Sequence, residues 1–201
     1  KHLNFKNYLQ QDNVDLSSSN KFSFKLNKKL KFSNLKIQSN LEVGNLEYSN
    51  LILKKFLPSL KDKILVQENK FKVEIENSNI KILGKSKVNI NNDIDDVSFS
   101  INKNNDKILF KSSIDIKQNA INFQNLNYTK RKDLNSTLNI DGIIYVNKFT
   151  TINKIKFKEG PNIIELDEIK INNNKKITSL DKLNIYIIND NQQLSELIIK
   201  R

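Results

Sequence analysis

The chain has 201 residues, of which 37% are hydrophobic and 28% are charged, and its net charge is +12. This length is sufficient for one sizeable β domain or two small ones. Cysteine is absent, which excludes disulfide and thiol chemistry, and no apolar run approaches the ~18 residues that a membrane-spanning helix needs. The chain starts at Lys1 and has no methionine, so we expect it to be a piece of a longer protein.

Residues 1–20 are polar and show no sustained hydrophobic period, which predicts a linker or a frayed strand. Hydrophobic and polar residues then alternate through 21–50, which predicts a first β segment. Residues 51–65 interrupt the alternation with an approximately helical spacing. Pro58 lies among them, and proline removes a helical hydrogen bond. We therefore expect a bend or a short helix at 51–65.

Residues 66–201 repeat one pattern, in which short alternating stretches are separated by turns rich in Asn, Asp and Gly. The stretches recur about every 8 to 12 residues, a spacing typical of an all-β chain. Gly84 and Ser86 are expected to be the small inward-facing residues of one strand. Asp141-Gly142 is a strong signal for a two-residue hairpin turn. The segment from Asp190 to Lys200 fits either a capped helix or a strand.

The clearest alternation runs from Ile108 to Tyr128. Successive side chains of a strand point to opposite faces, so this spacing predicts one apolar face and one polar face. Residues 118–120 are expected to reverse the chain. The alternation changes parity before Tyr128, which indicates a β-bulge. The whole stretch therefore predicts a curved antiparallel hairpin.

Catalytic chemistry has little support in this sequence. His2 is the only histidine, so arrangements that use His as a base are excluded, and no glycine-rich phosphate loop is present. The acidic cluster of residues 93–96 does not follow the spacing of a calcium loop, and we expect a solvated turn there. Glu165 and Asp167 share one outward face and are expected to be surface charges. We predict that the protein is not an enzyme and has no metal or other cofactor.

The positive charge by itself suggests a nucleic-acid partner. However, Arg131 and Arg201 are the only arginines, and the Phe residues alternate away from the lysines instead of forming an exposed stacking platform. Lys, Asn and Ile are abundant together, as an A+T-rich coding sequence would produce. Base composition can therefore account for much of the positive charge without selection for an anionic partner. We therefore expect no nucleic-acid partner.

A transmembrane β-barrel also has alternating strands, but it would need aromatic girdles, and the chain has no Trp. The sequence therefore does not favour a membrane barrel.

Strands with a single apolar face are compatible with two architectures. In a β-sandwich, the apolar faces of two layers bury one another. In a long curved antiparallel sheet, folded like a taco, the apolar face lines a groove that can hold acyl chains. Periodicity alone leaves both open.

The segment from Leu51 to Lys200 resembles the AsmA-like proteins of Gram-negative bacteria, of the YhdP and TamB type. The resemblance rests on Leu57-Pro58, on Ile114-Asp115-Ile116, on the run from Ile121 to Lys130 that closes in Asn127-Tyr128-Thr129-Lys130, and on Leu138-Asn139-Ile140-Asp141-Gly142. It implies a long β groove with at most one or two short helices.

The same resemblance implies a function. The chain would be a periplasmic segment of a protein anchored in the inner membrane, with phospholipid moving along its groove towards the outer membrane, where an outer-membrane protein is a further expected partner. The alternative is a structural or adhesive β-repeat with a self-packed core. The residues expected to line the groove and contact lipid are Val73, Ile75, Ile82, Val88, Phe99, Ile101, Phe110, Ile114, Ile116, Phe123 and Ile140.

Overall fold

The computed structural model describes residues 14–49, 61–90 and 93–201. Strands make up 74% of the structure and helix 2%, which confirms the predicted all-β class. The strands are β1 (Leu16–Leu26), β2 (Phe32–Val43), β3 (Leu46–Ser49), β4 (Lys63–Glu76), β5 (Asn79–Ile90), β6 (Asp93–Asn104), β7 (Lys107–Ile116), β8 (Ile121–Phe123), β9 (Tyr128–Lys130), β10 (Ser136–Tyr145), β11 (Phe149–Glu159), β12 (Asn162–Asn172), β13 (Ile177–Ser179), β14 (Lys182–Ile188) and β15 (Leu194–Lys200).

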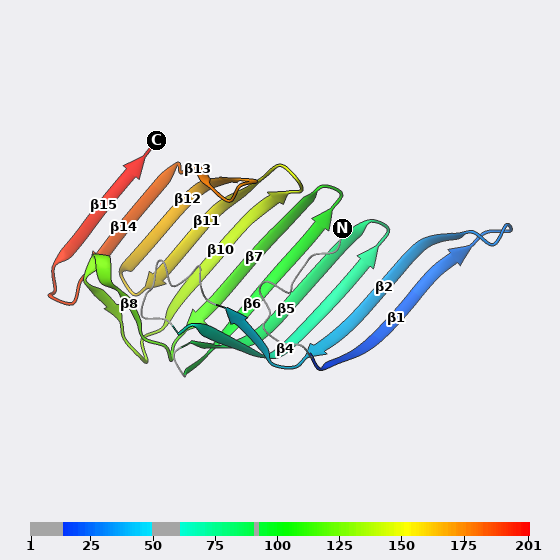
Figure 1. Ribbon diagram of the computed structural model, residues 1–201, viewed down its shortest axis with the longest axis horizontal. Helices are drawn as coiled ribbons and strands as arrows, with labels where there is room; N and C mark the ends of the chain where they lie inside the picture. The colour runs from blue at the N-terminus through cyan, green and yellow to red at the C-terminus, as the bar shows by residue number, and fades with distance from the viewer. Residues whose placement is uncertain (1–13, 50–60, 91–92) are drawn as a thin grey trace.

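Thirteen of these strands form one antiparallel sheet, which Figure 1 shows as a continuous twisted layer. Its order is β1-β2-β4-β5-β6-β7-β10-β11-β12-β14-β15, with β3 beside β4 and β13 beside β12. Most strands therefore lie next to the strand that precedes them in the chain, and this meander needs only short connections. β8 and β9 pair with each other in a separate small sheet. The prediction of a long antiparallel sheet is confirmed.

Asparagine side chains close several of the turns. The Oδ1 atom of Asn27 accepts hydrogen bonds from the backbone N–H groups of Lys29 and Lys31, at 2.9 and 3.0 Å. Asn172 and Asn189 repeat this arrangement in the turns that follow β12 and β14, with distances from 2.9 to 3.1 Å. An Asn side chain can take the place of a backbone acceptor in a turn. The chain therefore uses some of its abundant asparagines to reverse direction.

The predicted segment limits differ from the structure at two places. Residues 1–20 were expected to be a linker or a frayed strand; β1 begins at Leu16, so residues 16–20 belong to a strand that continues into the first β segment. β4 begins at Lys63, inside the expected bend at 51–65. Residues 1–13 and 50–60 lie outside the described part of the chain, so the rest of both predictions falls there. The ambiguous last segment contains a strand, β15, with Asp190 in the turn before it.

The prediction of a hairpin turn at Asp141-Gly142 is wrong, because both residues lie inside β10. The chain reverses instead between Tyr145 and Phe149. A Cβ atom on Gly142 would lie 2.4 Å from the carbonyl oxygen of Thr151 and 2.7 Å from the ring of Phe110. The register with β11 shifts at the same point. This glycine therefore permits a β-bulge and a close approach of two strands.

The predicted hairpin between residues 108–116 and 121–128 is also wrong. The first half is a strand, β7, but its partners in the sheet are β6 and β10. The expected bulge is a 3₁₀ turn, Gln124–Leu126, followed by Asn127 in the left-handed conformation. Ten residues of β10 align with β7, whereas β8 has only three residues. The longer ladder makes more backbone hydrogen bonds, and β8 leaves the large sheet.

Small residues and bulges shape the long strands. The predicted inward position of Gly84 is confirmed, because a Cβ atom there would lie 2.2 Å from the ring of Phe99 on the neighbouring strand. The ring covers the glycine and replaces the side chain that it lacks. Glu68 in β4 has a positive φ of 52° at a register shift, and bulges of this kind bend and twist a sheet. In the described ranges no helix is long and apolar enough to cross a membrane.

Candidate functional site

One face of the large sheet is apolar from β4 to β15. Cross-strand partners point to the same side of a sheet, so the register traces this surface. A central row consists of Phe71, Gly84, Phe99, Ser112, Ile140, Ile155, Leu166, Leu183 and Ile199. The flanking rows are Val73, Ile82, Ile101, Phe110, Gly142, Ile152 and Ile169, and Ser86, Val97, Ile114, Leu138, Phe157, Ile164, Ile185 and Leu197.

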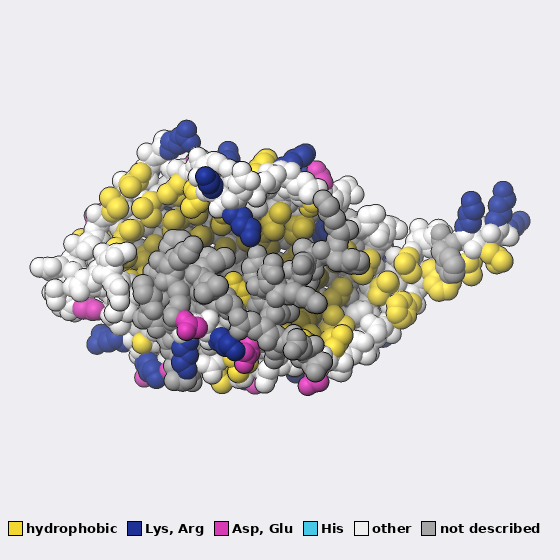
Figure 2. Space-filling view, viewed as in Figure 1, with side chains coloured by type: hydrophobic (Ala, Val, Ile, Leu, Met, Phe, Trp, Pro, Cys, Tyr) yellow, Lys and Arg dark blue, Asp and Glu magenta, His cyan; other side chains and the backbone are white. Residues whose placement is uncertain are grey.

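We call the surface formed by these three rows, with Ile75, Val88 and Ile116 at its margins, the apolar face. Figure 2 shows hydrophobic side chains spread across it and onwards along β1 and β2. On β1 and β2 the register continues the face through Phe22, Ile37 and Leu41. The strand alternation predicted from the sequence therefore produces a single extended hydrophobic surface.

Ten of the eleven predicted lipid-contacting residues lie on the apolar face: Val73, Ile75, Ile82, Val88, Phe99, Ile101, Phe110, Ile114, Ile116 and Ile140. Val88 and Ile116 are buried, and the other eight are partly buried. Phe123 differs, because it belongs to β8 and packs onto the face from above. Its ring centroid lies 5.2 Å from that of Phe157. Contact of these residues with lipid stays a prediction.

The β8–β9 hairpin packs on the part of the apolar face formed by β10, β11, β12 and β14. Tyr128, Phe157 and Ile187 form its buried centre, with exposed fractions of 3%, 4% and 0%. Around them pack the partly buried side chains of Phe123, Leu126, Leu138, Ile164 and Ile185. We call this part the hairpin section.

The remainder of the face between β4 and β7 we call the open section; its main side chains are Phe71, Val73, Ile82, Phe99, Ile101 and Phe110. Within residues 14–49, 61–90 and 93–201, no second large sheet lies against it. The two architectures left open by the sequence are therefore distinguished for these residues: the face is not the inner surface of a β-sandwich.

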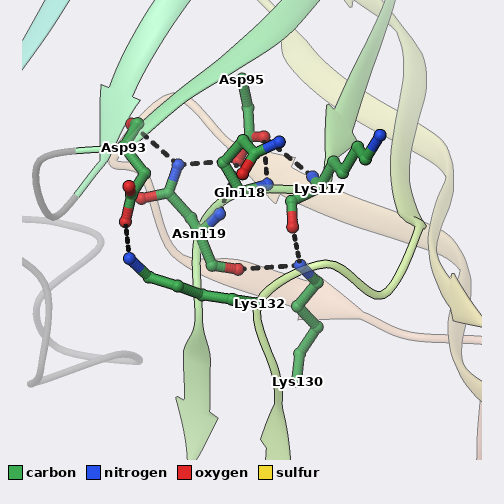
Figure 3. A network of polar contacts seen from close by, with 7 residues as sticks. All are labelled: Asp93, Asp95, Lys117, Gln118, Asn119, Lys130 and Lys132. Atoms are coloured by element: carbon green, nitrogen blue, oxygen red, sulfur yellow. Dashed lines mark hydrogen bonds and ion pairs between the residues drawn. The ribbon is translucent and has the colours of Figure 1, made fainter.

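A buried carboxylate fixes the connection between the large sheet and the hairpin (Figure 3). Asp95, at the beginning of β6, is 3% exposed. Its Oδ1 atom accepts hydrogen bonds from the N–H groups of Lys117 and Gln118, both at 2.8 Å. Its Oδ2 atom accepts from the N–H and the Nδ2 group of Asn119, at 3.3 and 2.7 Å. Successive backbone N–H groups form an anion-binding nest. The prediction of a solvated turn is therefore wrong for Asp95.

Lys130 completes this network from the hairpin side. Its fully buried ammonium group donates hydrogen bonds to the carbonyl oxygens of Lys117 and Asn119, at 2.8 and 2.9 Å. Burial lowers the pKa of Lys130, and the negative charge of Asp95 opposes this shift. The backbone oxygen of Asp93 accepts a hydrogen bond from Nδ2 of Asn119 at 2.9 Å. The carboxylate of Asp93 forms an ion pair with the ammonium group of Lys132 at 2.6 Å. The network holds the loop that leads into the hairpin against the sheet.

The opposite face of the sheet carries an ion-pair cluster. Glu165 lies within 2.8 to 3.6 Å of the ammonium groups of Lys182, Lys156 and Lys154, and Asp167 pairs with Lys154 and Lys182 at 3.4 Å. The hydrogen bond from Lys182, together with the other lysines, holds the pKa of Glu165 at about 2, against the opposing effect of burial. The prediction that Glu165 and Asp167 share one charged outward face is confirmed, but Glu165 is only 7% exposed, because the three lysines cover it, and it is therefore not a surface charge.

The described residues contain no group of three or more His, Cys, Asp or Glu side chains that could hold a metal ion. Sequence reasoning missed the network around Asp95 and Lys130. The acids of residues 93–96 and the Asn127–Lys130 run are both visible in the sequence, but no local pattern indicates that they meet across more than 30 residues. Only the packing of the hairpin on the sheet brings them together.

The fold and this surface define a class: an all-β protein built on one long antiparallel sheet, with one apolar and one charged face. Comparisons of the chain with protein-family models, with curated proteins and with solved structures give no match.

Proposed function

We propose that this chain carries the acyl chains of phospholipid on its apolar face. The observation that supports this proposal best is the continuous register of hydrophobic side chains from β4 to β15 on a single sheet. A surface of this extent, partly exposed to water, requires an apolar partner. An acyl chain of about sixteen carbons gains on the order of 10 kcal/mol when it is buried against such a surface.

The mechanism is burial and sliding, with no chemical step, so the proposal gives the protein no enzymatic role. Most side chains on the open section are aliphatic or Phe, and they offer no directional contacts that would hold a chain at one point. Neighbouring strands are about 4.8 Å apart, so the rows offer closely spaced equivalent positions along which a hydrocarbon can move. The partly exposed lysines of the opposite face, such as Lys154 and Lys156, keep that side in water.

In the cell, we propose that the chain is a periplasmic segment of an AsmA-like protein anchored in the inner membrane. Phospholipid would pass along its face between the inner and the outer membrane, where an outer-membrane protein receives it. The family resemblance of residues 51–200 supports this setting, and flanking sequence tests it. An N-terminal membrane helix and further strands of the same pattern are the expected result.

A structural or adhesive role is the second candidate. The hairpin section supports it, because there the apolar face is buried by protein around Tyr128 and Phe157. The two functions differ in what occupies the open section. A scaffold would leave it without lipid, whereas a lipid carrier would take up acyl chains there.

The test is lipid extraction from the purified protein with mass spectrometry, followed by uptake of a fluorescent fatty acid. We expect co-purified phospholipid and saturable uptake. Ile101→Asp should abolish uptake by placing a charge on the open section. Asn102→Asp is the matched control, because it adds the same charge to the next, exposed residue, which points to the opposite face. Ile116 is unsuitable for this test, because it is 2% exposed and Ile116→Asp would unfold the protein.

Circular dichroism should show that both variants are folded. A folded wild-type protein that carries no lipid and takes up no fatty acid would contradict the proposal and favour the scaffold. Equal uptake by the two Asp variants would show that the open section is not the binding surface.

A further inference from the structure

The hairpin of β1 and β2 projects beyond the rest of the sheet. The pairing of β2 with β4 ends at Lys36 and Glu76, whereas the pairing of β1 with β2 continues to Leu26 and Phe32. Figure 1 shows the two strands extending away from the body of the sheet towards their shared turn. We call residues 24–34 the projecting tip. Because β1 is an edge strand, the tip is paired with no other described strand.

The projecting tip is strongly basic. The sequence from Leu16 to Leu41 contains six lysines and no acidic residue, and so holds half of the net charge of +12. Lys36, at the base of the tip, is paired with Glu76 at 2.6 Å. Glu42, near the other end of the hairpin, lies about 25 Å from the tip along the strands, which is about three Debye lengths in physiological salt. The lysines of the tip are exposed and give it a local excess of positive charge: Lys25, Lys28, Lys29 and Lys31.

Large apolar side chains are exposed among these lysines, and Figure 2 shows basic and hydrophobic side chains together at the end of the hairpin. Phe24 is 48% exposed, Leu26 is 51% exposed and Leu30 is 76% exposed. Phe24 and Leu26 follow Phe22 at every second position of β1, so they lie on the side of the strand that continues the apolar face. An exposed apolar patch rimmed by polar groups marks an interaction site.

Leu30 is unusual when the tip is compared with two other turns of the same build. In each turn the Oδ1 atom of an asparagine accepts two backbone N–H groups; these residues are Asn27, Asn172 and Asn189. The third residue after each asparagine has a positive φ of 58° to 60°: Leu30, Lys175 and Gln192. This left-handed conformation favours Gly, Asn and Asp and gives leucine no advantage. The turn therefore does not account for the leucine, which points to a contact outside the chain.

We propose that the projecting tip docks on the surface of an anionic phospholipid bilayer. Leu26 and Leu30 enter the interfacial layer, and the ammonium groups of the neighbouring lysines contact the acidic headgroups. A lysine beside an inserted apolar side chain keeps its charge at the level of the headgroups, because its long stem reaches back to water. A nucleic acid would also attract the lysines, but exposed leucines gain nothing from a charged phosphate backbone, so the tip fits a lipid surface better.

The docking places a bilayer in line with the apolar face. Phe22, Ile37 and Leu41 carry this face along β1 and β2, so a lipid that leaves the bilayer at the tip meets a hydrophobic surface that leads to the open section. This passage rests on the proposed function. The docking itself does not, because it requires only the tip.

The experiment measures binding of the purified protein to vesicles by co-sedimentation. We expect binding to vesicles of equal parts phosphatidylglycerol and phosphatidylcholine, and little binding to pure phosphatidylcholine. Lys28→Gln combined with Lys29→Gln should weaken binding about thirtyfold, as the loss of two lysines at an anionic surface provides. Leu30→Asn should weaken it about tenfold, because an apolar side chain no longer enters the bilayer. Asparagine suits the positive φ of this position, so the variant should fold as well as the wild type.

The matched control is Lys175→Gln combined with Lys176→Gln. These exposed lysines lie in the turn of the same build that follows β12, so the double variant lowers the net charge by the same amount. Its binding should stay within about twofold of the wild type, because that turn is many Debye lengths from the docked tip.

The outcomes separate the docking from the proposed function. A wild-type protein that does not bind anionic vesicles but takes up fatty acid overturns the docking and leaves the lipid function intact. Equal weakening by the two lysine pairs also overturns it, because net charge alone would then be the cause. Unchanged vesicle binding by Leu30→Asn overturns the insertion of the tip, and tip-dependent binding of a single-stranded oligonucleotide in its place would assign the lysines to nucleic acid. Tip-dependent vesicle binding without fatty-acid uptake supports the docking and overturns the proposed function.

Discussion

The hairpin section and the open section belong to the same face of the same sheet, and they are built from the same kinds of residue. Phe157 and Phe110 occupy equivalent inward positions on β11 and β7, yet Phe157 is 4% exposed and Phe110 is only partly buried. The difference comes from the β8–β9 hairpin, which is held by the network around Asp95 and Lys130. Alternation makes a face apolar, but a separate tertiary contact decides whether protein fills it.

The comparison can be broken most strongly by removing one aromatic ring from each section. Phe157→Ala should lower the free energy of unfolding by about 3–5 kcal/mol, because it leaves a cavity in a closed cluster. Phe110→Ala should cost about 1–2 kcal/mol, because a partly exposed ring loses less burial. Urea denaturation measures both values. Equal losses would show that the open section is packed as tightly as the hairpin section.

The anchor of the hairpin gives the next largest effect. The carboxylate of Asp95 accepts four hydrogen bonds. In Asp95→Asn one carboxylate oxygen becomes an NH₂ group that points at other donors, so the free energy of unfolding should fall by about 2–4 kcal/mol. Hydrogen exchange of the amides of β8 and β9 should accelerate more than that of β5 and β6. Asp96→Asn changes an exposed neighbour and should stay within about 0.5 kcal/mol of the wild type. Uniform acceleration across the sheet would contradict the anchoring role.

Two glycines on the apolar face test how freely its strands can adjust, Gly84 in the open section and Gly142 in the adjoining strand β10. Gly142→Ala places a Cβ atom 2.4 Å from a backbone oxygen, which cannot move without distorting β11, and should cost about 1–3 kcal/mol. Gly84→Ala meets the ring of Phe99 at 2.2 Å. This ring is partly exposed and can rotate away from the sheet, so the cost should be about 1 kcal/mol or less. Thermal unfolding of both variants ranks them, and the reverse order would show that Phe99 is locked in place.

The smallest effect concerns the charged face, which both sections share. The pKa of Glu165 is about 2 in the folded protein, below its ordinary value of 4.5. Its ion pairs therefore stabilise the fold fully above about pH 4.5, and this contribution is lost as the pH falls from there towards 2. Partly exposed lysine partners limit it to roughly 1–2 kcal/mol. Glu165→Gln should be less stable at pH 7 by this amount and equal to the wild type near pH 2. A constant difference across this range would exclude the ion pairs as the cause.

The sequence was sufficient for local features of the fold. Alternation at Val73, Ile82 and Ile101 placed these residues on one face, because the pleat of a strand fixes side-chain direction without reference to other strands. It failed at Asp141-Gly142, where the same dipeptide that favours a hairpin turn also suits a bulge under the ring of Phe110. Local turn chemistry cannot distinguish these cases, because the difference lies in the neighbouring strand.

The candidate site was predicted in part for the same reason. Phe123 was expected in the large sheet because its alternation continues that of β7, but the longer ladder of β10 takes the place beside β7. The burial of Glu159 and Tyr128 had no sequence signal at all. These residues belong to β11 and β9, and their burial depends on how the hairpin lies on the sheet.

By itself, the sequence determined an all-β chain whose strands each have one apolar and one polar side, because the spacing of two residues is a property of the extended backbone. Only the tertiary structure decided that these strands form one sheet, that a short hairpin closes one end of its apolar face, and that Asp95 and Lys130 hold the hairpin there. These features depend on contacts between residues far apart in the chain, and such contacts are selected by the total of pairing and burial that a whole fold achieves.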